Sequence, residues 1–169
     1  MARSEFQDSY DDPVQLRPEI LDTPIRDLPL RHPVTVEADA TVADAIELMN
    51  EHHIGCVLVL RDERLVGIFT ERDVLTRVVF RHDGALVPIE TVMTPKPETL
   101  ELDGTIAFAL NMMSVGGYRH LPVVDAKGKP VAVLSVRDIV DYLVQLYPED
   151  VLNLPPCPSK GIADSIDGG

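Results

Sequence analysis

The sequence contains an internal duplication, in which the second copy follows the first by about 64 residues. Residues 33–42 align with residues 97–106 at an offset of 64. Gly128 lengthens a later turn, so residues 67–73 align with residues 132–138 at an offset of 65. Shared spacing of this kind indicates two copies of one structural unit, and we therefore expect a pseudo-twofold pair with a cleft between its halves.

Each copy predicts the same order of elements: strand, helix, strand, strand, helix. Apolar residues recur in the first helix of each copy at positions i, i+3, i+4 and i+7, which defines one buried face. These residues are Val42, Ala45, Ile46 and Met49 in the first copy and Ile106, Ala109, Leu110 and Met113 in the second. The predicted strands cover residues 34–36, 56–60 and 65–69 in the first copy and 98–100, 121–124 and 131–134 in the second. We expect an α+β fold of two tandem βαββα repeats that share a core.

The length of 169 residues and the 45% apolar content fit one compact body made of two small repeats. We expect a flexible acidic lead-in over residues 1–22, repeats over 23–83 and 84–147, and a flexible tail over 148–169. The formal net charge of −13 argues against a nucleic-acid partner, because phosphate backbones are bound by clustered Lys and Arg.

Targeting and redox signals are weak in this sequence. No apolar run approaches the roughly 18 residues that a membrane-spanning helix needs, and the first residues lack the apolar stretch of a signal peptide. We therefore expect a cytoplasmic location and no membrane partner. Cys56 lies in an apolar run and Cys157 in a proline-rich segment, a pattern that predicts two reduced thiols.

The motif with most chemical content occurs where a strand meets a helix, as residues 70–73 (Thr-Glu-Arg-Asp) and again as residues 135–138 (Ser-Val-Arg-Asp). A hydroxyl followed three residues later by a carboxylate is typical of a capping box, which only satisfies backbone amides. The same geometry suits an anion, because free amides and the helix dipole attract negative charge. A cap needs no arginine, yet Arg72 and Arg137 occupy the same place in both copies, which favours a ligand.

These motifs, together with Met93-Thr94-Pro95 and the run from Tyr118 to Asp125, resemble the consensus of the paired CBS domain, or Bateman module. The resemblance covers about residues 23–147. It implies a regulatory module, not an enzyme, that binds AMP, ADP, ATP or S-adenosylmethionine between the repeats and acts in trans on another protein. It implies no required cofactor beyond that regulatory nucleotide.

Carried over by position, the resemblance assigns the two aspartates to ribose hydroxyls and the two hydroxyl residues to phosphate. One cleft would use Ser135, Arg137, Asp138, Arg119 and His120, with Val34, Ile54 and Gly55 flanking the base. The other would use Thr70, Arg72 and Asp73, with Glu98, Tyr118 and Arg119 near the base. We expect the first of these clefts to hold charged phosphates, because the first repeat has Gly55 and Cys56 where the second has Arg119 and His120, so one cleft loses basic groups. Tyr118 fits either base stacking or plain packing.

Other chemistry finds little support. His52 and His53 are adjacent at a helix end and point in different directions, so we predict no metal site. No spacing supports a catalytic triad, and no P-loop accompanies an acidic cluster. We expect a homodimer, because twofold symmetry is the usual assembly. The alternative function is a ligand-independent dimerisation or scaffold module, whose motifs would only cap helices.

Overall fold

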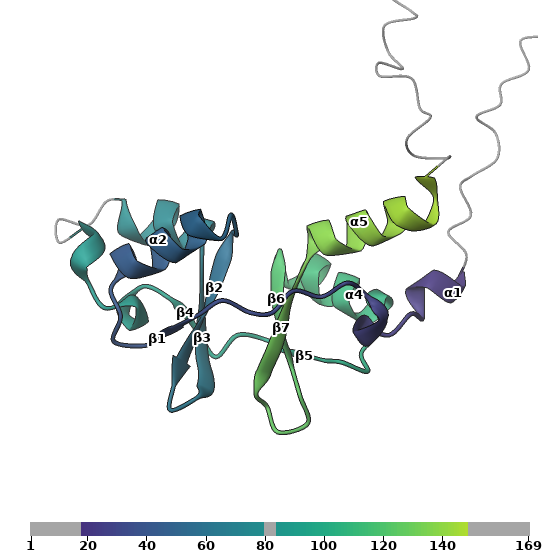
Figure 1. The fold of residues 1–169 in the computed structure, drawn as a ribbon, viewed down its shortest axis with the longest axis horizontal. Coiled ribbons are helices and arrows are strands. Elements are labelled where there is room, and N and C mark those ends of the chain that lie inside the picture. The colour runs from purple at the N-terminus through teal and green to yellow at the C-terminus, as the bar shows by residue number, and fades with distance from the viewer. Residues whose placement is uncertain (1–17, 80–83, 149–169) are drawn as a thin grey trace, which may run out of the picture.

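The computed structural model describes residues 18–79 and 84–148. Figure 1 shows two small sheets at the centre of the molecule, with helices covering each of them. The strands are β1 (Thr35–Glu37), β2 (Cys56–Arg61), β3 (Arg64–Thr70), β4 (Thr94–Pro95), β5 (Leu100–Glu101), β6 (His120–Val124) and β7 (Pro130–Ser135). The α-helices are α1 (Pro18–Leu21), α2 (Val42–Glu51), α3 (Glu71–Asp73), α4 (Ile106–Gly116) and α5 (Val136–Leu146). Among these residues, no helix is long and apolar enough to cross a membrane.

The two sheets have matching topology. In the first, the order is β1-β2-β3-β4, and in the second it is β5-β6-β7. A parallel pair begins each sheet, β1 with β2 and β5 with β6, and an antiparallel pair follows. A register shift interrupts both antiparallel pairs, at Val59/Leu60 and at Val123/Val124. The predicted α+β fold of two tandem repeats is therefore confirmed.

Capping residues set the start of the main helices, as the sequence indicates. Thr41 and Thr105 precede α2 and α4, and each hydroxyl accepts a hydrogen bond from the backbone amide three residues later. The helices that follow the motifs differ between the repeats. In the second repeat α5 is a continuous helix of 11 residues, but in the first α3 has three residues and passes into a π-helical turn, η2 (Val74–Val78).

The opening segment of each repeat packs on the other repeat, which the sequence does not predict. The Ile25 amide donates to the carbonyl of Gly104 at 2.8 Å in the second repeat. At the corresponding place, the Ile89 amide donates to the carbonyl of Ala40 at 2.8 Å in the first. In Figure 1, α1 accordingly lies beside α4, far from β1 and β2. The two repeats are thus exchanged at their leading ends.

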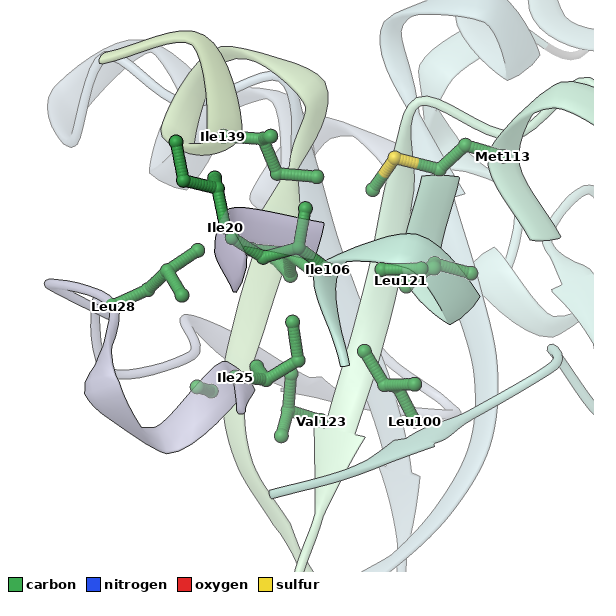
Figure 2. Close-up of a cluster of buried hydrophobic side chains, with 12 residues drawn as sticks. Ile20, Ile25, Leu28, Leu100, Ile106, Met113, Leu121, Val123 and Ile139 are labelled. Atoms are coloured by element: carbon green, nitrogen blue, oxygen red, sulfur yellow. The ribbon is translucent and has the colours of Figure 1, made fainter. Parts of the chain in front are cut away.

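These leading segments supply core side chains to their hosts. Ile20, Ile25 and Leu28 join the hydrophobic core of the second repeat, where Figure 2 shows them among residues of α4, β6 and α5. Val87, Ile89 and Val92 do the same in the first repeat. Burial of this apolar surface is what fixes the segments in place.

The structure corrects the expected boundary of the flexible lead-in. Within residues 1–22, Pro18–Leu21 form α1, and Ile20 is only 8% exposed, because its side chain enters the core of the second repeat. Residues 1–17 lie outside the described residues, as do residues 80–83 and the expected tail from residue 149 onward, including Cys157.

The two repeats meet through the central strands. Cys56, Leu58 and Ile68 form a small buried cluster, against which Leu65 and Val133 pack. An isolated bridge between Arg31 and Val133 adds the chain segment before β1 to this contact. The faces of β2, β3 and β7 therefore form the junction on which a shared cleft can be built.

Candidate functional site: a cleft between the two repeats

The second motif forms a complete capping box at the start of α5. The Ser135 amide and hydroxyl both donate to Oδ2 of Asp138, at 2.7 and 2.6 Å, and the Asp138 amide donates to the Ser135 hydroxyl at 3.2 Å. All the side-chain bonds of Asp138 use Oδ2, and its Oδ1 has no hydrogen-bond partner within residues 18–79 and 84–148. Capping therefore leaves one carboxylate oxygen available for a further contact.

The first motif makes the same box but has no free oxygen. The Thr70 amide and hydroxyl donate to Oδ2 of Asp73 at 2.9 and 2.7 Å. Nη1 of Arg77 lies 3.1 Å from Oδ1 of the same carboxylate, and Asp73 is only 5% exposed. The carboxylate that the resemblance assigns to a ribose is thus fully engaged within its own repeat.

A cleft of about 1340 Å³ lies between the repeats beside the second motif. Its volume is above the roughly 300–1,000 Å³ of typical small-molecule pockets, so a nucleotide has room within it. The walls come from both halves: the segment before β1, the C-terminal end of α2 and the start of α3 on one side, and β6, β7 and α5 on the other. This is the shared groove that the duplication predicts.

Eight of the thirteen predicted site residues line this one cleft. They are Val34, Ile54, Gly55, Arg119, His120, Ser135, Arg137 and Asp138. These residues are more than 100 positions apart at the extremes, so only the pairing of the repeats brings them together.

The other five predicted residues, those of the first motif together with Glu98 and Tyr118, are not in its lining. Glu98 is exposed in the segment between β4 and β5. Thr70 and Asp73 belong to the closed box, and Arg72 donates to the carbonyl of Gly117 at 3.3 Å across the junction. Tyr118 folds back over Gly116, where an added Cβ would meet its ring at 2.1 Å. The ring therefore packs on the end of α4, and its position supports the packing explanation.

Positive charges outnumber negative ones in the cleft, although the whole chain is acidic. Its arginines are Arg31, Arg119 and Arg137, against the carboxylates of Glu71 and Asp138, and three histidines, His32, His53 and His120, also line it. Such a local excess of positive charge attracts an anion, and the low-dielectric walls strengthen the attraction. Arg137 is 86% exposed and 3.7 Å from Asp141, so its guanidinium can turn toward a ligand at little cost.

Burial keeps two other groups of the cleft uncharged. It lowers the pKa of His120 below its ordinary value of 6.5, with Arg119 adding to the effect, although Glu71 and Asp138 oppose it. Burial also raises the pKa of the Cys56 thiol to about 12, helped by the same two carboxylates. A neutral imidazole can donate or accept a hydrogen bond here, and a protonated thiol is no nucleophile.

Sequence reasoning missed several residues of the cleft. Arg31 and His32 come from the segment before β1. Glu71 comes from the first motif, which the resemblance assigns to the other cleft. The sequence contains one indication of this: Arg31 and His32 form a basic pair close to Val34, the residue predicted to flank the base. Among the described residues, no group of three or more His, Cys, Asp and Glu side chains is arranged to hold a metal ion.

The fold defines a protein of two similar repeats that share a ligand-sized cleft. The family model described as CBS domain matches residues 25–79 and again residues 89–145, and the chain belongs to this family. Both matches begin within the exchanged leading segments, at Ile25 and at Ile89.

The chain is similar to an uncharacterised 17.7 kDa protein of Acidianus ambivalens, with 33% identity over 113 residues, which cover 66% of this chain and 68% of that protein. It is 38% identical over 105 residues to the CBS domain-containing protein CBSCBSPB5 of Arabidopsis thaliana, covering 62% of this chain but only 19% of the relative.

Solved structures share the fold. A putative signal-transduction protein with CBS domains from Burkholderia ambifaria is 34% identical, with a TM-score of 0.64 and coverage of 68% of this chain and 85% of that one. The CBS domain protein PAE2072 of Pyrobaculum aerophilum, complexed with AMP, is 25% identical, with a TM-score of 0.65 and coverage of 73% and 99%.

Proposed function

We propose that this chain is a regulatory module that binds an adenosine-containing nucleotide in the cleft between its repeats and acts in trans on a partner protein. The observation that carries the proposal is the convergence of eight predicted residues on one cleft, with an unpaired oxygen of Asp138 among them. A complex with AMP is known for PAE2072, a protein of the same family and fold.

The chemistry of the lining matches the parts of a nucleotide. Asp138 Oδ1 accepts from ribose hydroxyls, and the positive end of the α5 dipole attracts the phosphate. The Ser135 hydroxyl donates to the phosphate once it turns from Oδ2 of Asp138. Arg119 and Arg137 neutralise phosphate charge, and the neutral His120 contributes a hydrogen bond. The apolar residues Val34, Ile54 and Val133 provide a surface for the base.

Calorimetric titration of the full chain with AMP, ATP and S-adenosylmethionine tests this function. We expect saturable binding of at least one of them, together with an increase in melting temperature. A ligand at about 100 times its Kd stabilises the folded state by roughly 2.7 kcal/mol. Absence of binding by all three at millimolar concentration would remove the proposal.

A second function, ligand-independent dimerisation or scaffolding, is favoured by the capping boxes, which are complete without any ligand, and by exposed apolar side chains. Leu75 and Val79 after α3, and Val140 on α5, are 66%, 58% and 49% exposed. We expect a homodimer in either case. Thermal unfolding with and without nucleotide separates the two functions, because a scaffold forms a dimer whose melting temperature no nucleotide changes; light scattering checks the dimer itself.

A further inference from the structure

The carboxylates of the two motifs have unequal surroundings, although their capping boxes are the same. In the first repeat, Arg77 holds Oδ1 of Asp73 at 3.1 Å and also donates to the carbonyl of Val92 at 2.9 Å. The guanidinium therefore joins the motif to the segment that leads into the second repeat. Both oxygens of Asp73 are occupied, and the residue is buried.

The second repeat lacks this lock. At the offset of 65 that relates the two motifs, Tyr142 stands where the first repeat has Arg77. A phenol carries no positive charge at neutral pH, so it cannot replace the guanidinium as an ion-pair partner. Asp138 consequently keeps its free oxygen and lines the cleft.

The arginines inside the motifs show the same contrast. Arg72 reaches across the junction to the carbonyl of Gly117 at 3.3 Å. Its counterpart Arg137 lines the cleft, and its Nε lies 3.7 Å from Oδ2 of Asp141 on the same helix. One motif is thus tied to the opposite repeat, while the other is open to it.

The helix that follows the motif also differs between the two repeats. Arg77 lies in the π-helical turn η2, whereas Tyr142 lies in the uninterrupted helix α5. The π-helical turn follows directly on the three α-helical residues and places Arg77 beside Asp73. The ion pair acts against an anion at Asp73.

We propose that Arg77 acts as an internal substitute for a ligand, closing the first motif so that each chain offers one nucleotide site. The inference rests on the proposed function of the second cleft and adds its stoichiometry. A ribose could bind Asp73 only by displacing a guanidinium that is ion-paired with this carboxylate and hydrogen-bonded to the Val92 carbonyl, and the exchange leaves the positive group without a carboxylate partner. Arg77 is thus the residue that determines which half of the duplication binds.

Calorimetric titration of AMP and of ATP into the full chain measures the number of sites. The wild type is expected to bind one equivalent per chain. Arg77→Gln removes the charge but keeps a donor for the Val92 carbonyl, and it is expected to add a second, weaker equivalent. Arg77→Tyr copies the second repeat and provides an independent variant with the same expectation. Arg61→Gln, which removes the ion pair between the first repeat and Glu90 of the leading segment packed on it, is the matched control and should keep one equivalent.

The outcomes separate this inference from the proposed function. Two equivalents in the wild type, or one in both Arg77 variants when circular dichroism shows them folded, would overturn the inference alone. No equivalent in the wild type but one in Arg77→Gln would overturn the second cleft as the site and support the lock. No binding in any variant would overturn both. Asp73→Asn should leave the wild-type isotherm unchanged, and a weaker isotherm would contradict the closed motif.

Discussion

Replacement of Asp138 by alanine tests whether its carboxylate does more than cap α5. The variant loses the bonds from the Ser135 amide and hydroxyl, at 2.7 and 2.6 Å, and we expect a cost of about 0.5–2 kcal/mol in folding stability. For a chain of this size, each kcal/mol of stability lost lowers the melting temperature by about 2–4 °C. Loss of the free oxygen should in addition remove a charged hydrogen bond to the nucleotide, worth about 1.5–3 kcal/mol, or about a 10- to 150-fold weaker Kd.

The chain contains a matched control at the start of α2. There the Thr41 amide and hydroxyl donate to Oδ2 of Asp44 at 2.9 and 2.7 Å, in the same box as that of Asp138. Asp44 does not line the cleft between the repeats. Asp44→Ala should therefore lower the melting temperature by a similar amount while leaving the nucleotide Kd unchanged.

Thermal unfolding monitored by circular dichroism and calorimetric titration of the same samples measure both effects. We expect Asp138→Ala and Asp44→Ala to have similar stability but different affinity for the nucleotide. If Asp138→Ala binds AMP and ATP as tightly as Asp44→Ala does, the carboxylate is only a cap. The assignment of a ribose contact to Asp138 would then be refuted.

Three further predictions concern burial. Because the pKa of His120 is lower in the folded state, the unfolded chain binds the proton more readily, so stability should be complete above pH 6.5 and fall as the pH drops below it. His120→Gln should make melting temperatures less dependent on pH between 7 and 5; an unchanged dependence would contradict the burial effect. In a Cys157→Ser background, Cys56 should resist maleimide at pH 8 until the chain unfolds, and rapid labelling of the native state would oppose its raised pKa. Ile25→Ala should cost about 2–5 kcal/mol in denaturant unfolding, because Ile25 is fully buried in the core of the second repeat; a negligible loss would argue against the exchanged leading segment.

Much of the fold follows from local patterns that the sequence displays. The apolar periodicity around Val42 and Ile106 indicates α2 and α4, and the threonines before them mark where these helices begin. Five of the seven strands, β1, β2, β3, β6 and β7, lie within about one residue of their predicted ends; β5 begins two residues late and β4 was not predicted. Helix caps and alternating strands depend on neighbours within a few residues, so one copy of the pattern is enough to predict each of them.

The site was only partly predictable, for a related reason. The resemblance in both copies places Val34, His120 and Asp138 at one cleft, and the structure brings them together there. The segment that carries Arg31 and His32 has no recognisable motif, and its place in the cleft depends on an exchange between the repeats. Such long-range packing leaves no periodic signal in the chain.

The sequence by itself determined the doubled α+β unit, its helix starts and the motifs that face the junction. Only the tertiary structure decided that the leading segments are exchanged, and that one motif is closed while the other is open. The closure depends on where Arg77 points: it is ion-paired with the neighbouring carboxylate of Asp73 and donates to a carbonyl 15 residues away. A charge on one side of a helix can meet solvent, a ligand or its own chain, and three-dimensional packing decides which of these it meets.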